Sequence, residues 1–92
     1  MSYKQQVEKI QAILEEAKVP QRWYSINTPV DNKISIVAEL DGIHLFILEH
    51  NARLGEEILT NWYETIKFSA EMVELQYTER IMCVAQKYRS VL

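Results

Sequence analysis

The 92-residue sequence has little of what several kinds of structure require. Two glycines and two prolines are too few for the many tight turns of an all-β domain. The single cysteine, Cys83, excludes an intramolecular disulfide, and no structural zinc signature is present. The charged N-terminus is not a signal peptide, and no apolar run approaches the roughly 20 residues of a membrane span. We therefore expect a cytoplasmic protein that does not enter a membrane.

The composition of the chain is that of an ordinary globular protein. Apolar residues make up 48% and charged residues 25%, which is not typical of a disordered chain. The length favours a single domain over residues 1–92, with one core between two layers of secondary structure.

Basic residues are scarce in the middle of the chain. Residues 39–79 contain nine acidic residues against two basic ones, although the whole chain carries a net charge of only −3. This distribution argues against direct nucleic-acid binding, which needs a basic surface. It suits a basic protein partner, because opposite fields steer association, and it also suits a role in solubility alone.

Amphipathic patterns predict a helix at each end of the chain. Over residues 2–18, apolar side chains recur at spacings of three and four, and Ser2 can cap the first turn with Gln5 as its capping-box partner. A long helix is expected over residues 69–90, with Ser69 as its N-cap. The buried stripe of this second helix is expected to contain Ala70, Val73, Tyr77, Ile81, Val84 and Tyr88.

Strands are predicted between the two helices. Residues 22–27 have the composition of a strand. The two apolar runs of residues 33–50 flank an Asp-Gly pair at 41–42, which is a signal for a two-residue hairpin turn. If those two residues form the loop, Glu39 lies opposite His44.

Alternation along the hairpin places its side chains on two faces. One face is apolar throughout and is expected to be core: Ile34, Ile36, Ala38, Leu40, Ile43, Leu45 and Ile47. The other face is mixed: Ser35, Val37, Glu39, His44, Phe46, Leu48 and His50. Two helices can cover only one face of so small a sheet, so we expect the mixed face to stay at least partly open.

The segment after the hairpin is ambiguous. Residues 51–56 are expected to form a connection, and residues 57–67 fit either a strand or a helix, with the strand favoured. The predicted fold class is α+β, with an N-terminal helix, a three- or four-stranded antiparallel sheet and a long C-terminal helix packed on one sheet face.

No group of residues has the spacing of a catalytic or metal centre. His44 and His50 lie six apart on one strand, about 20 Å at ~3.3 Å per residue, so one ion cannot bridge them. Cys83 falls in the middle of the last helix, away from any group that would activate its thiol. No phosphate loop, nucleophile elbow or dinucleotide fingerprint is present. We expect no enzyme activity, no cofactor and no metal, and a contact of His44 with Glu39 that favours the charged imidazole.

The mixed sheet face is the candidate site for a protein partner. Val37, Phe46 and Leu48 form an apolar centre inside a polar rim, which is the layout of an interface. The full candidate set is Val37, Glu39, His44, Phe46, Leu48, Glu49, His50, Arg53, Glu56 and Glu57. Alternatively, a helix covers this face as a second core, or the chain forms a homodimer through it or through a stripe with Leu75 and Met82.

Residues 43–73 resemble one group of small immunity proteins from bacterial polymorphic-toxin systems. Residues 24–26 (Tyr-Ser-Ile) match the first strand of that family, and residues 68–71 match the start of its final helix. Glu49 and Arg53 fall where the family has an acid and a base. The family has Arg and Gly directly after the acid, whereas this chain has His and Asn, and Ile43 stands where the family has an aromatic residue.

The resemblance implies neutralisation of a cognate toxin by tight binding, with a basic toxin domain as the protein partner. Two other groups have a similar architecture: small phage-encoded anti-CRISPR proteins, which inhibit nuclease complexes, and acidic homodimeric secretion chaperones. A toxin inhibitor is the leading expectation, and an anti-defence inhibitor or a dimeric chaperone or adaptor is the alternative.

Overall fold

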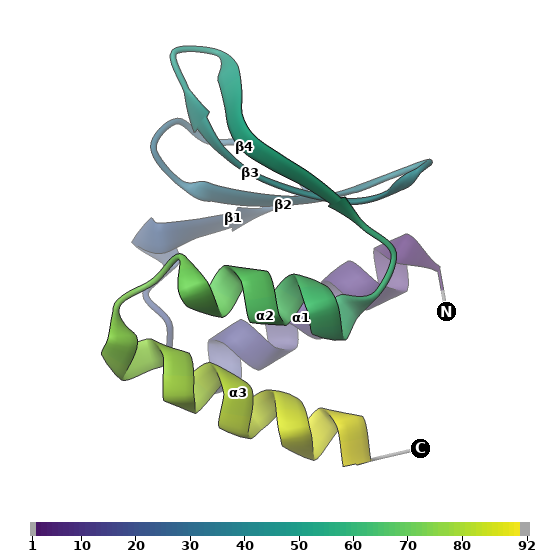
Figure 1. Ribbon diagram of the computed structural model, residues 1–92, viewed down its shortest axis with the longest axis vertical. Helices are drawn as coiled ribbons and strands as arrows, with labels where there is room; N and C mark the ends of the chain where they lie inside the picture. Colours follow the sequence, from purple (N-terminus) through teal and green to yellow (C-terminus); the bar gives the residue numbers. More distant parts are fainter. Residues whose placement is uncertain (1, 91–92) are drawn as a thin grey trace.

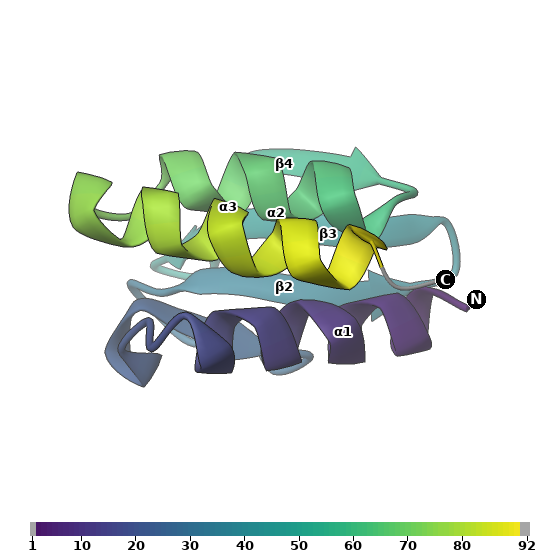
Figure 2. The same ribbon diagram turned by 90° about the horizontal axis from the view of Figure 1, so that it is seen from below.

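The computed structural model describes residues 2–90 and contains one four-stranded sheet and three α-helices (Figure 1). The elements in chain order are α1 (Tyr3–Glu16), the 3-10 helix η1 (Gln21–Trp23), β1 (Tyr24–Ile26), β2 (Ile34–Glu39), β3 (Gly42–Glu49), β4 (Ala52–Leu59), α2 (Trp62–Glu71) and α3 (Leu75–Ser90). The helices all lie on one side of the sheet, and no described helix covers the other side (Figures 1 and 2). The predicted α+β class and N-terminal helix are confirmed.

Helix α1 begins as the sequence predicts. The Ser2 side chain accepts a hydrogen bond from the Gln5 backbone N–H at 3.1 Å, and the Gln5 side chain accepts one from the Ser2 N–H at 2.9 Å. Further along, Gln6 is buried, and its side-chain oxygen accepts a hydrogen bond from the Trp62 N–H at 2.8 Å. This bond joins the first helix to the start of α2, which lies 56 residues away in the chain.

The core fills the space between the sheet and the helices. Its fully buried large side chains come from both layers: Val7, Ile10 and Ile13 of α1, Ile36 of β2, Ile43 and Leu45 of β3, Ile66 of α2 and Ile81 of α3. Burying a side chain of this size contributes about 1.5–3 kcal/mol. The apolar sheet face therefore is core, as predicted, except at two positions. Leu40 is 103% exposed in a turn, and Ile47 is 37% exposed near the end of β3.

The β2–β3 hairpin exists, but its predicted register is wrong. The loop is Leu40-Asp41, and Gly42 is already in β3, where it pairs with Glu39. Gly42 has φ +152°, and a Cβ there would lie 2.6 Å from the Leu59 carbonyl oxygen of β4. The glycine is needed for this close approach of β4 and not for the turn. Because β3 moves by two positions relative to the prediction, an even number, the predicted assignment of side chains to the two faces holds.

Strand β1 is parallel to β2, which corrects the prediction of a fully antiparallel sheet. Tyr24 pairs with Ile34 and Ile26 with Ile36. A parallel pair usually needs a connection of about a dozen residues. Here residues 27–33 suffice because β1 is only three residues long, and the chain folds back directly to the start of β2.

The connection predicted over residues 51–56 is wrong, because most of this segment belongs to a further strand, β4. Strand β4 covers Ala52–Leu59 and forms an edge of the sheet. A tight turn at His50 and Asn51, which both have positive φ, joins it to β3. The strand predicted for residues 57–67 is therefore correct only at its beginning, because α2 starts at Trp62.

The single C-terminal helix predicted over residues 69–90 is two helices. The N-cap of α2 is Asn61, whose side-chain oxygen accepts from the N–H groups of Tyr63 and Glu64 at 2.7 and 3.2 Å. Ser69 is not a cap; it is buried within α2 and donates to the Thr65 carbonyl. No glycine or proline marks the break before α3. The Thr78 hydroxyl of α3 links the two helices by donating a hydrogen bond to the Ala70 carbonyl of α2 at 2.8 Å.

Every residue of the buried stripe predicted for the C-terminal region faces the core. Ala70, Ile81 and Val84 are buried, and the remaining members pack against the core while partly exposed: Val73, Tyr77 and Tyr88. Leu75, placed on a second stripe, is 80% exposed at the start of α3. No helix within residues 2–90 has both the length and the apolar content that crossing a membrane requires.

Candidate functional site

Several side chains on the helix-free face of the sheet are buried, although no described helix covers this face. The β3–β4 hairpin curls away from the helices (Figure 1). Phe46 points to this face, because alternation places it opposite to Ile43 and Leu45 of the core. It is nevertheless 0% exposed, and the Arg53 guanidinium lies over its ring, 4.3 Å from the centroid.

A bulge in β4 causes this curl and shapes the site. Leu45 pairs with Glu57 and Ile47 with Leu54, so β4 has one more residue than β3 between these pairs. Gly55 lies in the extra stretch with φ +60°, the left-handed conformation that one common type of bulge requires. In a regular strand, residues three apart point to opposite faces. The bulge instead turns the side chain of Glu56 to the same face as that of Arg53.

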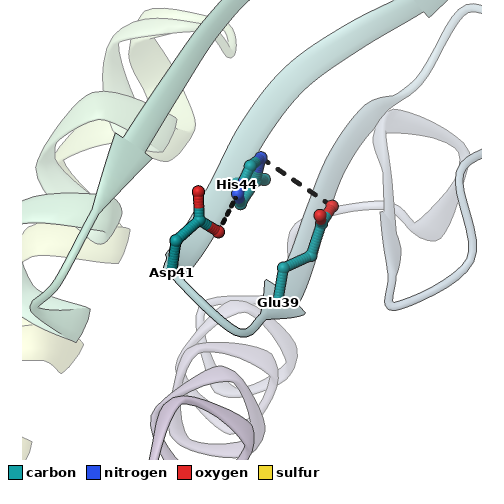
Figure 3. A group of neighbouring side chains, drawn as sticks. All are labelled: Glu39, Asp41 and His44. Atoms are coloured by element: carbon teal, nitrogen blue, oxygen red, sulfur yellow. Dashed lines mark hydrogen bonds and ion pairs between the residues drawn. The ribbon is translucent and has the colours of Figure 1, made fainter.

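His44 is the centre of a cluster of charged side chains on this face (Figure 3). Its imidazole is 8% exposed and contacts a carboxylate at each nitrogen. Nε2 lies 2.7 Å from the Asp41 carboxylate, and Nδ1 lies 2.8 Å from the Glu56 carboxylate. Glu39 is a further neighbour, 3.7 Å from Nδ1. The expected His44–Glu39 contact is present, but it runs diagonally, since the strand partner of His44 is Val37.

The two hydrogen bonds fix the protonation state of His44. An ionised carboxylate only accepts hydrogen bonds, so each ring nitrogen must donate, and only the imidazolium has two N–H donors. Burial by itself lowers the pKa of His44. The hydrogen bonds to Glu56 and Asp41 and the charge of Glu39 together outweigh burial and raise the pKa above its ordinary value of 6.5.

Arg53 completes the cluster. Its Nη1 donates to Glu56 at 2.7 Å and to Glu39 at 3.1 Å. The hydrogen bond from His44 lowers the pKa of Asp41, and those from His44 and Arg53 lower the pKa of Glu56. The cluster consists of Glu39, Asp41, His44, Arg53 and Glu56. With three carboxylates and two cations, it has one net negative charge.

The carboxylates of this cluster are held in place from below and remain accessible from above. The side chains of Glu39, Asp41 and Glu56 are 34%, 62% and 31% exposed, whereas His44 beneath them is almost fully buried. A free glutamate side chain loses up to about 2 kcal/mol of rotamer entropy when it is ordered. In this cluster that ordering has already occurred, so the acids form a preorganised acceptor for a cation.

The same cluster is the one place among residues 2–90 where side chains have metal-ligand spacing. One ligand atom each from Glu39, Asp41 and His44 lies within 4.8 Å of the others (Figure 3). Oxygen and imidazole ligands of this kind suit a divalent ion. However, a metal would have to displace a proton from His44 and compete with Arg53, whose guanidinium already forms ion pairs with Glu39 and Glu56.

The other candidate residues divide between the two faces of the sheet. Val37 and Leu48 are half-buried on the same face, beside His44 and Arg53 in the register. The remaining three are exposed: Glu49 at the end of β3, His50 in the β3–β4 turn and Glu57 on β4. Glu57 pairs with Leu45 and so lies toward the helix-covered side, away from the cluster. Glu49 lies on that side as well, because it follows Leu45 and Ile47 in the alternation of β3.

Two features of the site differ from the sequence-based expectation. Phe46 was expected to anchor a partner, but its complete burial under the curled hairpin makes its side chain unavailable for contact. Asp41 was not expected to take part because it was interpreted as a turn residue. Its position three residues before His44 in a tight hairpin loop is the signal that could have identified it.

Cys83 is exposed on α3, on the helix side of the sheet, and its thiol has no described contact with a histidine. Comparisons with protein-family models, with curated proteins and with solved structures find no match to this chain. The geometry of the charged cluster is therefore the observation on which a functional argument can be based.

Proposed function

We propose that this chain is a stoichiometric inhibitor of the immunity type, which acts in the cytoplasm by binding a basic protein domain through its helix-free sheet face. The observation that carries the proposal is the group of exposed carboxylates held in place by the buried His44. The resemblance of residues 43–73 to toxin-immunity proteins supports a toxin domain as the partner.

The charged cluster favours a partner with lysine or arginine side chains. Asp41 is the most exposed of the three cluster acids and has no contact with Arg53, so it is open to a cation of the partner. Opposite charges steer association, and acids that are already ordered lose little entropy on binding.

The protonation state of His44 supports binding in preference to catalysis. A general base needs an unprotonated nitrogen within reach of a substrate. Both nitrogens of His44 donate to carboxylates and the ring is buried, so the group has no free lone pair to accept a proton. We accordingly propose that the protein has no catalytic activity of its own.

Charge reversal on the helix-free face tests this proposal. We expect the variant Asp41→Lys to lose the binding of a basic partner captured by the tagged wild-type protein from its native host. A lost desolvated charge contact corresponds to a weakening of about 10- to 100-fold in Kd. Binding is measured by mass spectrometry of the captured proteins and then by titration calorimetry with the purified partner at low and at high salt.

The matched control is Glu79→Lys, which reverses an exposed acid on α3, on the helix side of the molecule. It should retain the partner, and wild-type binding should weaken as salt rises. Equal capture by wild type and Asp41→Lys contradicts the proposal. So does a purely homodimeric protein that captures nothing, which favours a chaperone or adaptor. Capture of a nuclease complex instead of a toxin contradicts the toxin assignment and favours an anti-defence inhibitor.

A further inference from the structure

A hollow of about 470 Å³ lies on the opposite side of the sheet from the charged cluster. It opens where η1, the beginning of β2, the end of β3 and the connection between α2 and α3 come together, at the left in Figure 1. Its apolar surface comes from Ile34, Ile47 and Met72, with the indole of Trp23 beside them. Ile47 is 37% exposed here, and its strand partner Leu54 is 46% exposed.

Two cations that have no partner among the described residues also line the hollow. Within residues 2–90, most lysine and arginine side chains contact a carboxylate, a carbonyl oxygen or an aromatic ring: Lys9, Arg53, Lys67, Arg80, Lys87 and Arg89. Arg22 and Lys33 have no such described contact, and both line the hollow. The one acid in its lining is Glu74, which accepts a hydrogen bond from the Gln76 side chain at 2.7 Å.

The walls of the hollow are fixed by contacts outside it. The Trp23 ring packs edge-on against Tyr77, with 6.0 Å between the ring centroids. The Asn32 N–H donates to the Leu48 carbonyl at 2.8 Å, which ties the loop before β2 to the end of β3. The site is therefore formed in the absence of a ligand, and its volume is in the usual range for small-molecule sites.

We propose that this hollow binds a small organic monocarboxylate with an apolar or aromatic body. Arg22 and Lys33 would hold the carboxylate, because both line the hollow and no group within residues 2–90 neutralises them. The body of the ligand would lie on Trp23 and on Ile34, Ile47 and Met72. With two cations and Glu74, the lining has one net positive charge, so a single negative charge is favoured over a dianion.

The test uses the full chain and three probes: phenylacetate, its uncharged analogue phenylacetamide, and acetate, which lacks the ring. Binding is followed by two-dimensional 1H-15N NMR. We expect phenylacetate to cause saturable shifts at the Trp23 indole and at the Asn32 and Lys33 amides. The two other probes should bind at least about 5-fold more weakly, because phenylacetamide lacks the negative charge and acetate lacks the apolar ring.

The variants Arg22→Gln and Lys33→Gln should each weaken phenylacetate binding about 3- to 10-fold. Lys4→Gln, which removes an exposed unpaired cation on α1, should leave it unchanged. Equal affinity for phenylacetate and phenylacetamide, or no saturable shift at the hollow, overturns the proposal. The Asp41→Lys variant should bind phenylacetate like wild type, because the hollow and the charged cluster share no residue, so the two proposals fail independently.

Discussion

At the residue scale, His44 decides how the acidic side chains of this protein are presented. A single glutamate or aspartate on a strand is mobile and hydrated, and contributes little to recognition. In this protein, the buried imidazolium bonds to Asp41 and Glu56 together, and Arg53 bonds to Glu56 and Glu39. One buried side chain thereby converts separate surface acids into a fixed array.

The pKa of His44 should make stability depend on pH. Because its pKa is raised in the folded state, the folded protein binds more protons than the unfolded chain above pH 6.5. The stabilisation is complete below 6.5 and is lost as pH rises through the folded-state pKa. Asp41 and Glu56 have lowered pKa values, so their contribution is lost as pH falls below about 4. Stability should be greatest between these limits.

We expect His44→Gln to abolish the loss of unfolding free energy as pH rises above 6.5. The loss of unfolding free energy at acidic pH should remain but be smaller. Urea unfolding at several pH values measures the profile, and NMR titration of the His44 ring gives its pKa directly. A pKa at or below 6.5 in the wild-type protein would show that the two hydrogen bonds do not hold in solution.

At the element scale, one bulge assembles the site. Without the extra residue at Gly55, alternation would turn Glu56 to the helix side of the sheet, away from His44 and Arg53. The bulge also twists the exposed edge strand β4, which carries Arg53, Glu56 and Glu57. Charged side chains and a bulge are both known to discourage pairing of a free edge with another strand.

We expect Gly55→Ala to destabilise the fold by about 1–2 kcal/mol, the cost of a left-handed conformation for an ordinary residue. A Cβ at this position would meet no atom within 4 Å, so the cost is one of backbone conformation and not of a steric clash. Gly55→Asn is the matched control and should cost less, because asparagine tolerates positive φ. Equal loss of stability in both variants, measured by urea unfolding, would point to a cause other than φ.

At the scale of the whole molecule, the sheet buries side chains on both faces. Phe46, Ser35 and His44 are buried on the face without helices, where Arg53 lies over Phe46 and the carboxylates of Asp41 and Glu56 contact His44. The sheet therefore has a main core on its helix-covered face and a second, small buried region on its helix-free face. Its accessible helix-free surface is made of charged and half-buried side chains around a small second core.

Phe46→Ala should consequently lower the free energy of unfolding by about 3–5 kcal/mol, the usual cost of removing a buried phenylalanine. Leu40→Ala, at the exposed tip of the β2–β3 hairpin, should change it by less than about 0.5 kcal/mol. Chemical denaturation followed by circular dichroism compares the two. If Phe46→Ala leaves stability unchanged, then Phe46 is a surface residue in solution, as its position on the mixed face first suggested.

Local patterns in the sequence were sufficient for several features. The first helix follows from its capping box and its 3.6-residue period, and the two faces of the hairpin follow from alternation, which survives an even shift in register. The excess of acids in the middle of the chain is also a property of the sequence. These features depend on residues that are near each other in the chain, so nearest-neighbour chemistry determines them.

The remaining features required the tertiary structure. The register of β3 is set by the contact of Gly42 with β4, and the break between α2 and α3 is set by packing and by the bond from Thr78 to Ala70, with no glycine or proline to mark it. The charged cluster needs His44, Arg53 and Glu56 on one face, which a bulge achieves. The sequence alone determines the net charge of each segment. The tertiary structure decides which acidic side chains are held in place, because that depends on contacts between strands.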